Sequence, residues 1–175
     1  VARRNLAGAS VGNYALFAGG WDGSQRNTVD AYNASLVRST PTALSATRDN
    51  LAGASLGDYA LFAGGSIGST TYANTVDAYS TDLVRSTPTA LSVARQDLAG
   101  ASVGNYALFA GGFSGSGTHR NTVDAYTSQI SVARLYMPVG TKYQFGSDQE
   151  QTATTSVVDV LPPLTGYIKY KKGVI

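Results

Sequence analysis

The sequence lacks the side chains on which most metal and redox chemistry depends. No cysteine occurs among its 175 residues, which excludes disulfides, thiolate metal sites and cysteine nucleophiles. His119 is the single histidine, and this disfavours metal sites and catalytic triads built on imidazole. No serine or lysine lies in a recognisable nucleophile motif. We therefore expect no catalytic activity, no metal and no cofactor.

Charged residues and long apolar runs are also scarce. Asp, Glu, Lys and Arg make up 14% of the chain and the formal net charge is +2, so no binding of nucleic acid is expected. No apolar run approaches the roughly 20 residues that cross a bilayer, and no membrane insertion is expected. The polar surface must therefore come largely from serine, threonine, asparagine and glycine.

Three near copies of one segment dominate what is present. The heptapeptide YALFAGG occurs at residues 14–20, 59–65 and 106–112, after a segment close to NLAGAS and before a copy of NTVDAY. The copies are 45 and 47 residues apart, a period typical of a four-stranded propeller blade or of a helical hairpin. The β-branched and aromatic residues, bounded by glycine, favour strands over helices.

Turn signals divide each repeat into four predicted strands. The first three are LAGAS, YALFA and TVDAY, and the fourth lies within residues 36–44 and 83–91 of the first two repeats. Pro41 and Pro88 fit an outer strand, since proline cannot donate to a central ladder. The small residues of LAGAS suit an innermost strand that is crowded by its neighbours. We predict an all-β fold of three four-stranded repeats, at about 1–48, 49–95 and 96–134.

The repeats resemble the kelch repeat over residues 1–134. In that family a hydrophobic strand ends in a double glycine, and a loop, a strand ending in tyrosine, a tryptophan, a proline and an arginine follow in order. The matching residues are Gly19-Gly20, Tyr32, Pro41 and Arg48, then Gly64-Gly65, Tyr79, Pro88 and Arg95, and in part Gly111-Gly112, Tyr126 and Arg134. The resemblance implies kelch-like β-propeller blades, which form an incomplete ring within this chain.

The repeats depart from the kelch pattern at one place. Leu36 and Leu83 stand where kelch repeats carry tryptophan, and the third repeat lacks the whole stretch. The chain is therefore similar to divergent kelch-like arrays of bacteria and bacteriophages rather than to the ubiquitin-ligase adaptors of animals. This resemblance implies a component of a phage tail or a bacterial surface, with an extracellular or virion-associated location.

Three blades are too few for a ring, because propellers typically have at least about four. The tripeptide VAR at residues 1–3 matches VAR at residues 93–95, so the chain begins inside a repeat. We expect either further blades upstream or a second copy of the chain to complete the ring, in a homo-oligomer or a larger assembly. Exposed blade edges would otherwise promote aggregation.

Candidate binding residues lie in the loops that follow YALFAGG. The loops at 21–26, 66–73 and 113–120 differ strongly while the flanking strands are nearly constant, which is the usual arrangement of a binding surface. Arg48 and Arg95 are expected to approach the same face from the junctions between repeats. The candidate ligand-binding residues are Trp21, Asp22, Arg26, Arg48, Tyr72, Arg95, Phe113, His119 and Arg120.

The composition of these loops suits a sugar ligand. An aromatic ring stacks on the C–H face of a sugar ring while neighbouring polar side chains bond its hydroxyls. We predict a non-catalytic binding or structural module whose loops recognise a cell-surface glycan or protein. Two alternatives stay open: a purely structural assembly subunit with no ligand of its own, and a fragment of a larger propeller enzyme.

Asp30, Asp77 and Asp124 recur at one position of the TVDAY strand. Such a series could suggest a ring of functional carboxylates. We interpret it instead as structural, with each side chain bonded to the backbone or to threonine.

Beyond residue 134 the repeat ends, and a small C-terminal β module is predicted at 135–175. Strand composition occurs at 141–145, 154–161 and 165–175. A module of about 40 residues is marginal as an independent fold, so we expect it to dock on the propeller or on a partner.

Overall fold

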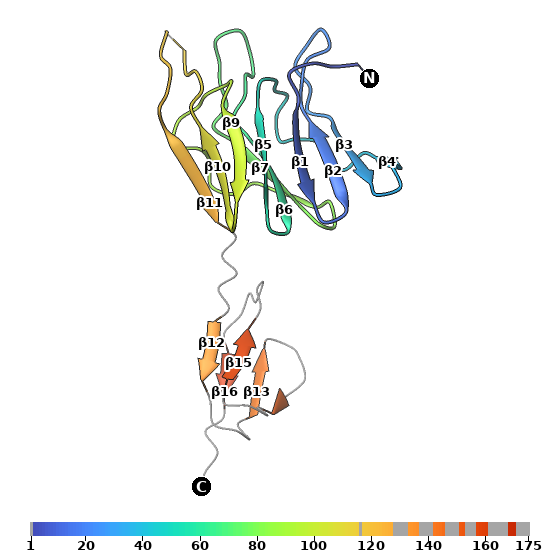
Figure 1. The fold of residues 1–175 in the computed structure, drawn as a ribbon, viewed down its shortest axis with the longest axis vertical. Coiled ribbons are helices and arrows are strands. Elements are labelled where there is room, and N and C mark those ends of the chain that lie inside the picture. The colour runs from blue at the N-terminus through green and yellow to red at the C-terminus, as the bar shows by residue number, and fades with distance from the viewer. Residues whose placement is uncertain are drawn as a thin grey trace. The chain divides into compact units, whose positions relative to one another are not determined.

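The computed structural model describes residues 2–115, 117–127, 133–136, 142–145, 151–152, 157–160 and 168–170. All regular elements within these ranges are β-strands, which confirms the predicted all-β fold. The chain divides into two compact units, Val1–Ser128 and Gln129–Ile175 (Figure 1). The repeat-based boundary was predicted a little later, between residues 134 and 135. No helix in the described ranges is long and apolar enough to cross a membrane.

The first unit consists of three antiparallel sheets, one for each sequence repeat. The first sheet contains β1 (Ala7–Val11), β2 (Tyr14–Ala18), β3 (Val29–Asn33) and β4 (Arg38–Ser39), in that order. The second contains β5 (Ala52–Leu56), β6 (Tyr59–Ala63), β7 (Val76–Ser80) and β8 (Arg85–Ser86). The third contains β9 (Ala99–Val103), β10 (Tyr106–Ala110) and β11 (Val123–Thr127). Each strand pairs with its neighbour along the chain, so every sheet is a simple meander.

These strands confirm most of the predicted pattern. YALFA forms the second strand of each sheet over its full predicted length, and the third strand begins one residue later than predicted. The fourth strand has only two residues in each of the first two sheets. It ends before Pro41 and Pro88, because proline has no N–H to continue the ladder.

The third sheet differs from the predicted four strands. Three strands belong to it within the described residues. The physical reason is in the sequence, since the stretch that supplies Arg38–Ser39 and Arg85–Ser86 in the other sheets is missing after β11.

The first strands of the three sheets lie side by side, β1 beside β5 and β5 beside β9 (Figure 1). A Cβ atom on Gly53 would stand 2.3 Å from the Gly8 carbonyl oxygen, and one on Gly100 would stand 2.2 Å from that of Gly53. Only glycine permits so close an approach of two backbones. The crowding predicted for LAGAS is therefore confirmed.

Hydrogen bonds connect the same strands from sheet to sheet. The Asn50 N–H donates to the Asn5 carbonyl oxygen at 2.9 Å, and the Asp97 N–H donates to that of Asn50 at 3.0 Å. Serines repeat the pattern further along the strands, in the pairs Ser10–Ser55 and Ser55–Ser102. The N–H donations are therefore equivalent at the two junctions, whereas the serine hydroxyls bond differently.

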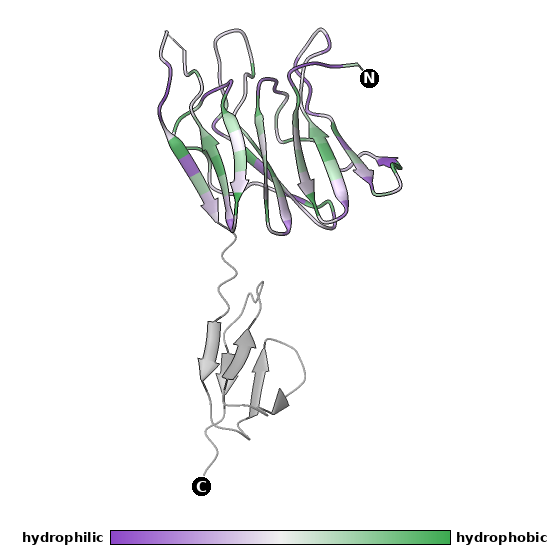
Figure 2. Ribbon diagram, viewed as in Figure 1, coloured by the Kyte–Doolittle hydropathy of each residue, from purple (hydrophilic) through white to green (hydrophobic). Residues whose placement is uncertain are grey.

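Two apolar cores fill the gaps between the sheets. Leu16 and Val29 of the first sheet pack with Phe62 and Tyr79 of the second, and all four side chains are almost completely buried. The second core repeats this arrangement between the second and third sheets. Figure 2 shows apolar segments in strands of all three sheets. The second sheet therefore buries both of its faces, one against each neighbour.

The second unit contains five short strands in its described residues. They are β12 (Ala133–Tyr136), β13 (Lys142–Phe145), β14 (Gln151–Thr152), β15 (Val157–Val160) and β16 (Ile168–Tyr170). β12 pairs with β15, and β13 pairs with both β14 and β16. The three predicted strands overlap β13, β15 and β16, whereas β12 and β14 were not predicted. The remaining parts of the predicted segments lie outside the described residues.

Candidate functional site

The three loops that vary in sequence lie at one end of the first unit (Figure 1). They connect β2 to β3, β6 to β7 and β10 to β11. In each loop the first residue forms backbone bridges both to the segment before the sheet and to a residue later in the loop. The first residues are Trp21, Ser66 and Phe113, and the later ones are Gln25, Tyr72 and His119. The repeat therefore holds equivalent backbone positions while the side chains differ.

Three of the predicted site residues form one aromatic cluster. The ring of Tyr72, from the second loop, meets the ring of Phe113, from the third, with centroids 5.9 Å apart and planes at 84°. His119 meets the Phe113 ring at 5.7 Å and 61°. Tyr72 and Phe113 are partly buried and His119 is exposed. Edge-to-face contacts of this kind are favourable, so the cluster joins two neighbouring loops at the surface.

Residues of the third loop complete this cluster. Gly115, with a φ of 92°, allows the loop to approach Tyr72, because a Cβ atom there would stand 3.1 Å from the ring. Arg120 follows His119 and is exposed. Its Nε donates to the Ser114 hydroxyl at 2.7 Å. The third loop therefore adds an exposed cation to the aromatic surface.

The first loop carries a different set of predicted residues. Trp21 is tied to Arg4 by two backbone hydrogen bonds of 2.8 and 3.0 Å. The Nε of Arg26 donates to Asp22 at 2.6 Å, and this bond holds the pKa of the Asp22 carboxyl below its usual value. Within the described ranges, no three histidine, aspartate or glutamate side chains gather as metal ligands would.

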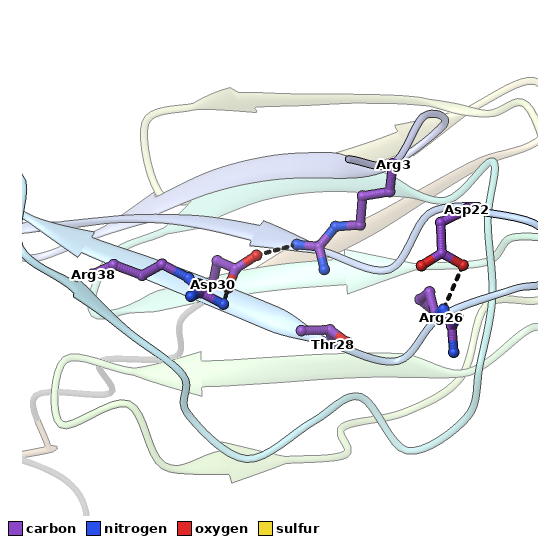
Figure 3. Close-up of a pocket in the computed structure, with 6 residues that line it drawn as sticks. All are labelled: Arg3, Asp22, Arg26, Thr28, Asp30 and Arg38. Atoms are coloured by element: carbon purple, nitrogen blue, oxygen red, sulfur yellow. Dashed lines mark hydrogen bonds and ion pairs between the residues drawn. The ribbon is translucent and has the colours of Figure 1, made fainter. Parts of the chain in front are cut away.

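A hollow of about 340 Å³ opens on the first sheet beside this ion pair (Figure 3). It is lined by Arg3, Asp22, Arg26, Thr28, Asp30 and Arg38. The two carboxylate oxygens of Asp30 are divided between Arg3 and Arg38, each at 2.6 Å. Three arginines against two aspartates leave the lining of the hollow with a net positive charge.

The structure corrects the predicted role of Arg48. Its backbone reaches the loop end, where its N–H donates to the Arg26 carbonyl oxygen at 3.0 Å, but its side chain is fully buried. The guanidinium forms an ion pair with Asp77, which is also fully buried. It donates further to the carbonyl oxygens of Phe62, Gly64 and Thr75. Burial lowers the pKa of Arg48, and the charge of Asp77 opposes this effect. A ligand on the loops has no access to this group.

Arg95 is corrected in the same way. Its side chain is fully buried, bonds Asp124 at 2.8 Å and donates to the Phe109 carbonyl oxygen at 3.0 Å. Burial alone would raise the pKa of Asp124, but hydrogen bonds from Arg95 and Ser92 outweigh it and hold that pKa below its usual value. Both arginines therefore connect the segments of the scaffold rather than line the loop face.

The sequence analysis did not predict that an arginine forms an ion pair with each of the strand aspartates Asp30, Asp77 and Asp124. The expected backbone bond is present at two of the three, because the N–H groups of Ser45 and Ser92 donate to Asp77 and Asp124. The stronger interaction of each aspartate is its ion pair with arginine, and a regular spacing in the sequence indicates this pair. An arginine precedes each aspartate by 27 or 29 residues in every repeat.

Comparisons with known proteins support the fold and nothing finer. No family model matches the sequence, and no curated protein matches it. Among 144 matching chains of solved structures is that of YjhT. Its likeness has a TM-score of 0.65 and 14% sequence identity over 73% of this chain. This chain spans 43% of the length of the YjhT chain.

At this identity the likeness shows the fold alone. The class of protein that fold and comparison define is an all-β protein built from repeated antiparallel sheets. The kelch resemblance and the phage-tail or bacterial-surface setting stay predictions.

Proposed function

We propose that the chain is a non-catalytic binding module in which the three sheets are blades of a β-propeller and the variable loops bind a cell-surface glycan. One sheet per repeat, innermost strands side by side and an apolar core in each gap support the blade arrangement. Loops that gather at one end of a rigid scaffold are the usual place for binding.

The observation that carries the proposal is the aromatic cluster of Tyr72, Phe113 and His119. Two neighbouring repeats build it together. At the preceding junction, the positions of Tyr72 and Phe113 are occupied by Gln25 and Ser66. The loops keep the same backbone bridges there without any aromatic pair. Because the scaffold does not need the pair, recognition is the better explanation for it.

The chemistry of the cluster fits a sugar. An exposed ring face accepts the C–H face of a pyranose, and polar groups beside it bond the hydroxyls. Tyr72 and Phe113 supply the rings, His119 supplies a ring nitrogen and Arg120 supplies a guanidinium whose fork also suits a sugar carboxylate. The proposed ligand is therefore a neutral or acidic glycan.

Glycan-array screening of the full chain, followed by calorimetric titration with the best-bound sugar, tests this proposal. Tyr72→Ala and Phe113→Ala are expected to lower the affinity about tenfold each, since an aromatic contact contributes on the order of 1 kcal/mol besides its buried area. Tyr59→Ala is the matched control. Tyr59 is an exposed aromatic residue at the start of β6, whereas the second loop follows the end of that strand.

A lowered affinity of the two loop variants with unchanged affinity of the control supports the proposal. Equal affinity in all three variants contradicts the loop site, and no binding to any glycan contradicts the ligand class. Trp21→Ala tests the extent of the site. Unchanged affinity in this variant confines the site to the second and third loops.

A further inference from the structure

The first sheet exposes an aromatic face that is buried in the other sheets. The rings of Phe17 and Tyr32 meet at 6.1 Å and 75°, and the same pair recurs as Phe62 and Tyr79 in the second sheet. Phe62 and Tyr79 are fully buried against the first sheet, whereas Phe17 is 40% exposed. The leading face, as we name it, consists of Ala15, Phe17, Asp30 and Tyr32.

The third sheet exposes the face that, in the first and second sheets, packs on the following sheet. Val103 and Val123 are 63% and 57% exposed. Their counterparts in the second sheet, Leu56 and Val76, are buried because the third sheet covers them. The trailing face, as we name it, consists of Val103, Leu108, Val123 and Ala125.

Each junction inside the chain pairs a trailing face with a leading face. Between the first and second sheets, Leu16 and Val29 pack on Phe62 and Tyr79. The junction between the second and third sheets repeats the same contact. The structure therefore shows twice what covers each kind of face. A second copy of this chain has the faces needed to cover both the exposed leading face and the exposed trailing face.

Backbone groups at the two ends are complementary as well. At both internal junctions the later sheet donates an N–H to the earlier sheet's carbonyl oxygen. In the described part of the chain, the Asn5 N–H makes no bond of this kind and the Asp97 carbonyl oxygen accepts none. Ser10 and Ser55 each donate an N–H to the serine hydroxyl of the next sheet, and the Ser102 N–H makes no such bond within the described residues. Asn5 of one copy can thus donate to Asp97 of another.

Asp30 lines the hollow on the first sheet, and the equivalent position of the second sheet is covered by the preceding sheet's connecting segment. In the second sheet Asp77 accepts from the N–H and the hydroxyl of Ser45, at 3.2 and 3.0 Å, besides its arginines. The Tyr79 hydroxyl donates to the Thr42 carbonyl oxygen at 2.8 Å. Both donor and acceptor come from the segment that follows the preceding sheet. The corresponding Asp30 bonds only arginines within the described residues.

We propose that two copies of the chain associate head to tail, with the trailing face of each on the leading face of the other, to form a closed ring of six sheets. Contacts between unlike faces either close into a ring or continue into a filament. Propellers typically have about four to eight blades, and the three sheets of the first unit in two copies add up to six. The inference rests on the blade arrangement of the proposed function but not on its glycan site.

Native mass spectrometry and sedimentation of the full chain test this association. The expected mass is twice the 18.1 kDa of one chain. Val123→Asp on the trailing face is expected to give monomers, because each contact in the ring uses one trailing face. Phe17→Asp on the leading face is expected to do the same. Val84→Asp is the control, since Val84 is 64% exposed but belongs to neither face.

Gly8→Ala is a milder variant that separates association from folding. Within one copy the added Cβ would stand 3.6 Å from the Phe17 ring, an ordinary contact. In the proposed ring, Gly8 of one copy lies beside Gly100 of the other copy, as Gly53 lies beside Gly8 within one chain. A Cβ atom on Gly8 would therefore clash with the Gly100 carbonyl oxygen of the other copy. We expect circular dichroism to show an unchanged fold and mass spectrometry to show loss of the dimer.

The absence of cysteine allows the contact to be trapped. A mixture of Ser10→Cys and Ser102→Cys chains is expected to form a disulfide-linked dimer, whereas neither variant alone forms one efficiently. A wild-type chain that stays monomeric at its highest soluble concentration overturns the proposal. So does an open series of larger oligomers, or a dimer that persists in Val123→Asp and Gly8→Ala. Glycan binding is measured separately, so its failure leaves these outcomes unchanged.

Discussion

The carbonyl oxygen of Gly8 lies so close to Gly53 that a Cβ atom on Gly53 would stand 2.3 Å from it. Strands β1 and β5 therefore meet through their backbones, with no side chain between them. In the same way, a Cβ atom on Gly100 would stand 2.2 Å from the Gly53 carbonyl oxygen. The glycine of LAGAS is thus required by the neighbouring sheet rather than by a turn in its own strand.

Gly53→Ala is expected to lower the free energy of unfolding by at least about 2 kcal/mol, because the new methyl group forces a backbone to shift. Urea unfolding followed by circular dichroism measures the loss. Gly68→Ala is the control, since the nearest atom to its Cβ would be 3.8 Å away, on Thr71. An equally small effect of both substitutions would show that the strands separate without cost.

Asp77→Ala is expected to destabilise the protein by about 3–5 kcal/mol, since it leaves the buried Arg48 without its counterion. Both side chains of this pair are 0% exposed. Asp22→Ala removes an ion pair in which Arg26 is 47% exposed, and no measurable loss is expected because such pairs contribute little. Chemical unfolding of the two variants checks the difference. Similar losses in both would contradict a decisive role for burial.

The fold was largely predictable because its signals are local. YALFAGG carries its strand propensity and its terminal glycines within seven residues, and the chain repeats it three times. The end of the fourth strand was also predictable from Pro41 and Pro88. The third sheet has three strands within the described residues because the stretch that forms the fourth strand elsewhere is missing from the sequence, whereas four strands were predicted for every repeat.

The candidate site was less predictable because its contacts are distant in sequence. Arginine is almost never fully buried unless it is paired, so Arg48 resembled a surface residue until Asp77 was placed against it, 29 residues later. The contact of Tyr72 with Phe113 depends on the packing of two sheets and on the approach of Gly115. Loop composition identified these aromatic residues but could not show which of them meet.

The ionisation of Tyr126 is expected to lower the stability of the protein at alkaline pH. Its hydroxyl donates to the Thr89 carbonyl oxygen at 2.9 Å, and burial, assisted by the charge of Asp124, raises the pKa of Tyr126 to about 12. An unfolded tyrosine ionises near pH 10, so above that pH the unfolded state loses a proton that the folded state keeps. The contribution is complete below about pH 10 and disappears as the pH rises to about 12.

Unfolding free energies measured across this alkaline range check the effect. Tyr126→Phe is expected to reduce the decline, because phenylalanine has no proton to lose. Part of the decline is expected to remain, since burial also raises the pKa of Tyr79. An unchanged decline in Tyr126→Phe would assign the effect to other groups.

Leu36→Asn is expected to stabilise the protein by about 0.5–1 kcal/mol, because Leu36 holds a left-handed backbone conformation that asparagine adopts more easily. Its φ is 58°, and its side chain is 80% exposed and loses little when replaced. Leu83 has the same conformation, with a φ of 60°, but packs against the first apolar core. Leu83→Asn should therefore gain less or lose stability, because the relief of strain is offset by lost apolar contact. Thermal unfolding of the two variants measures the contrast, and an equal gain in both would show that the core contact of Leu83 contributes nothing.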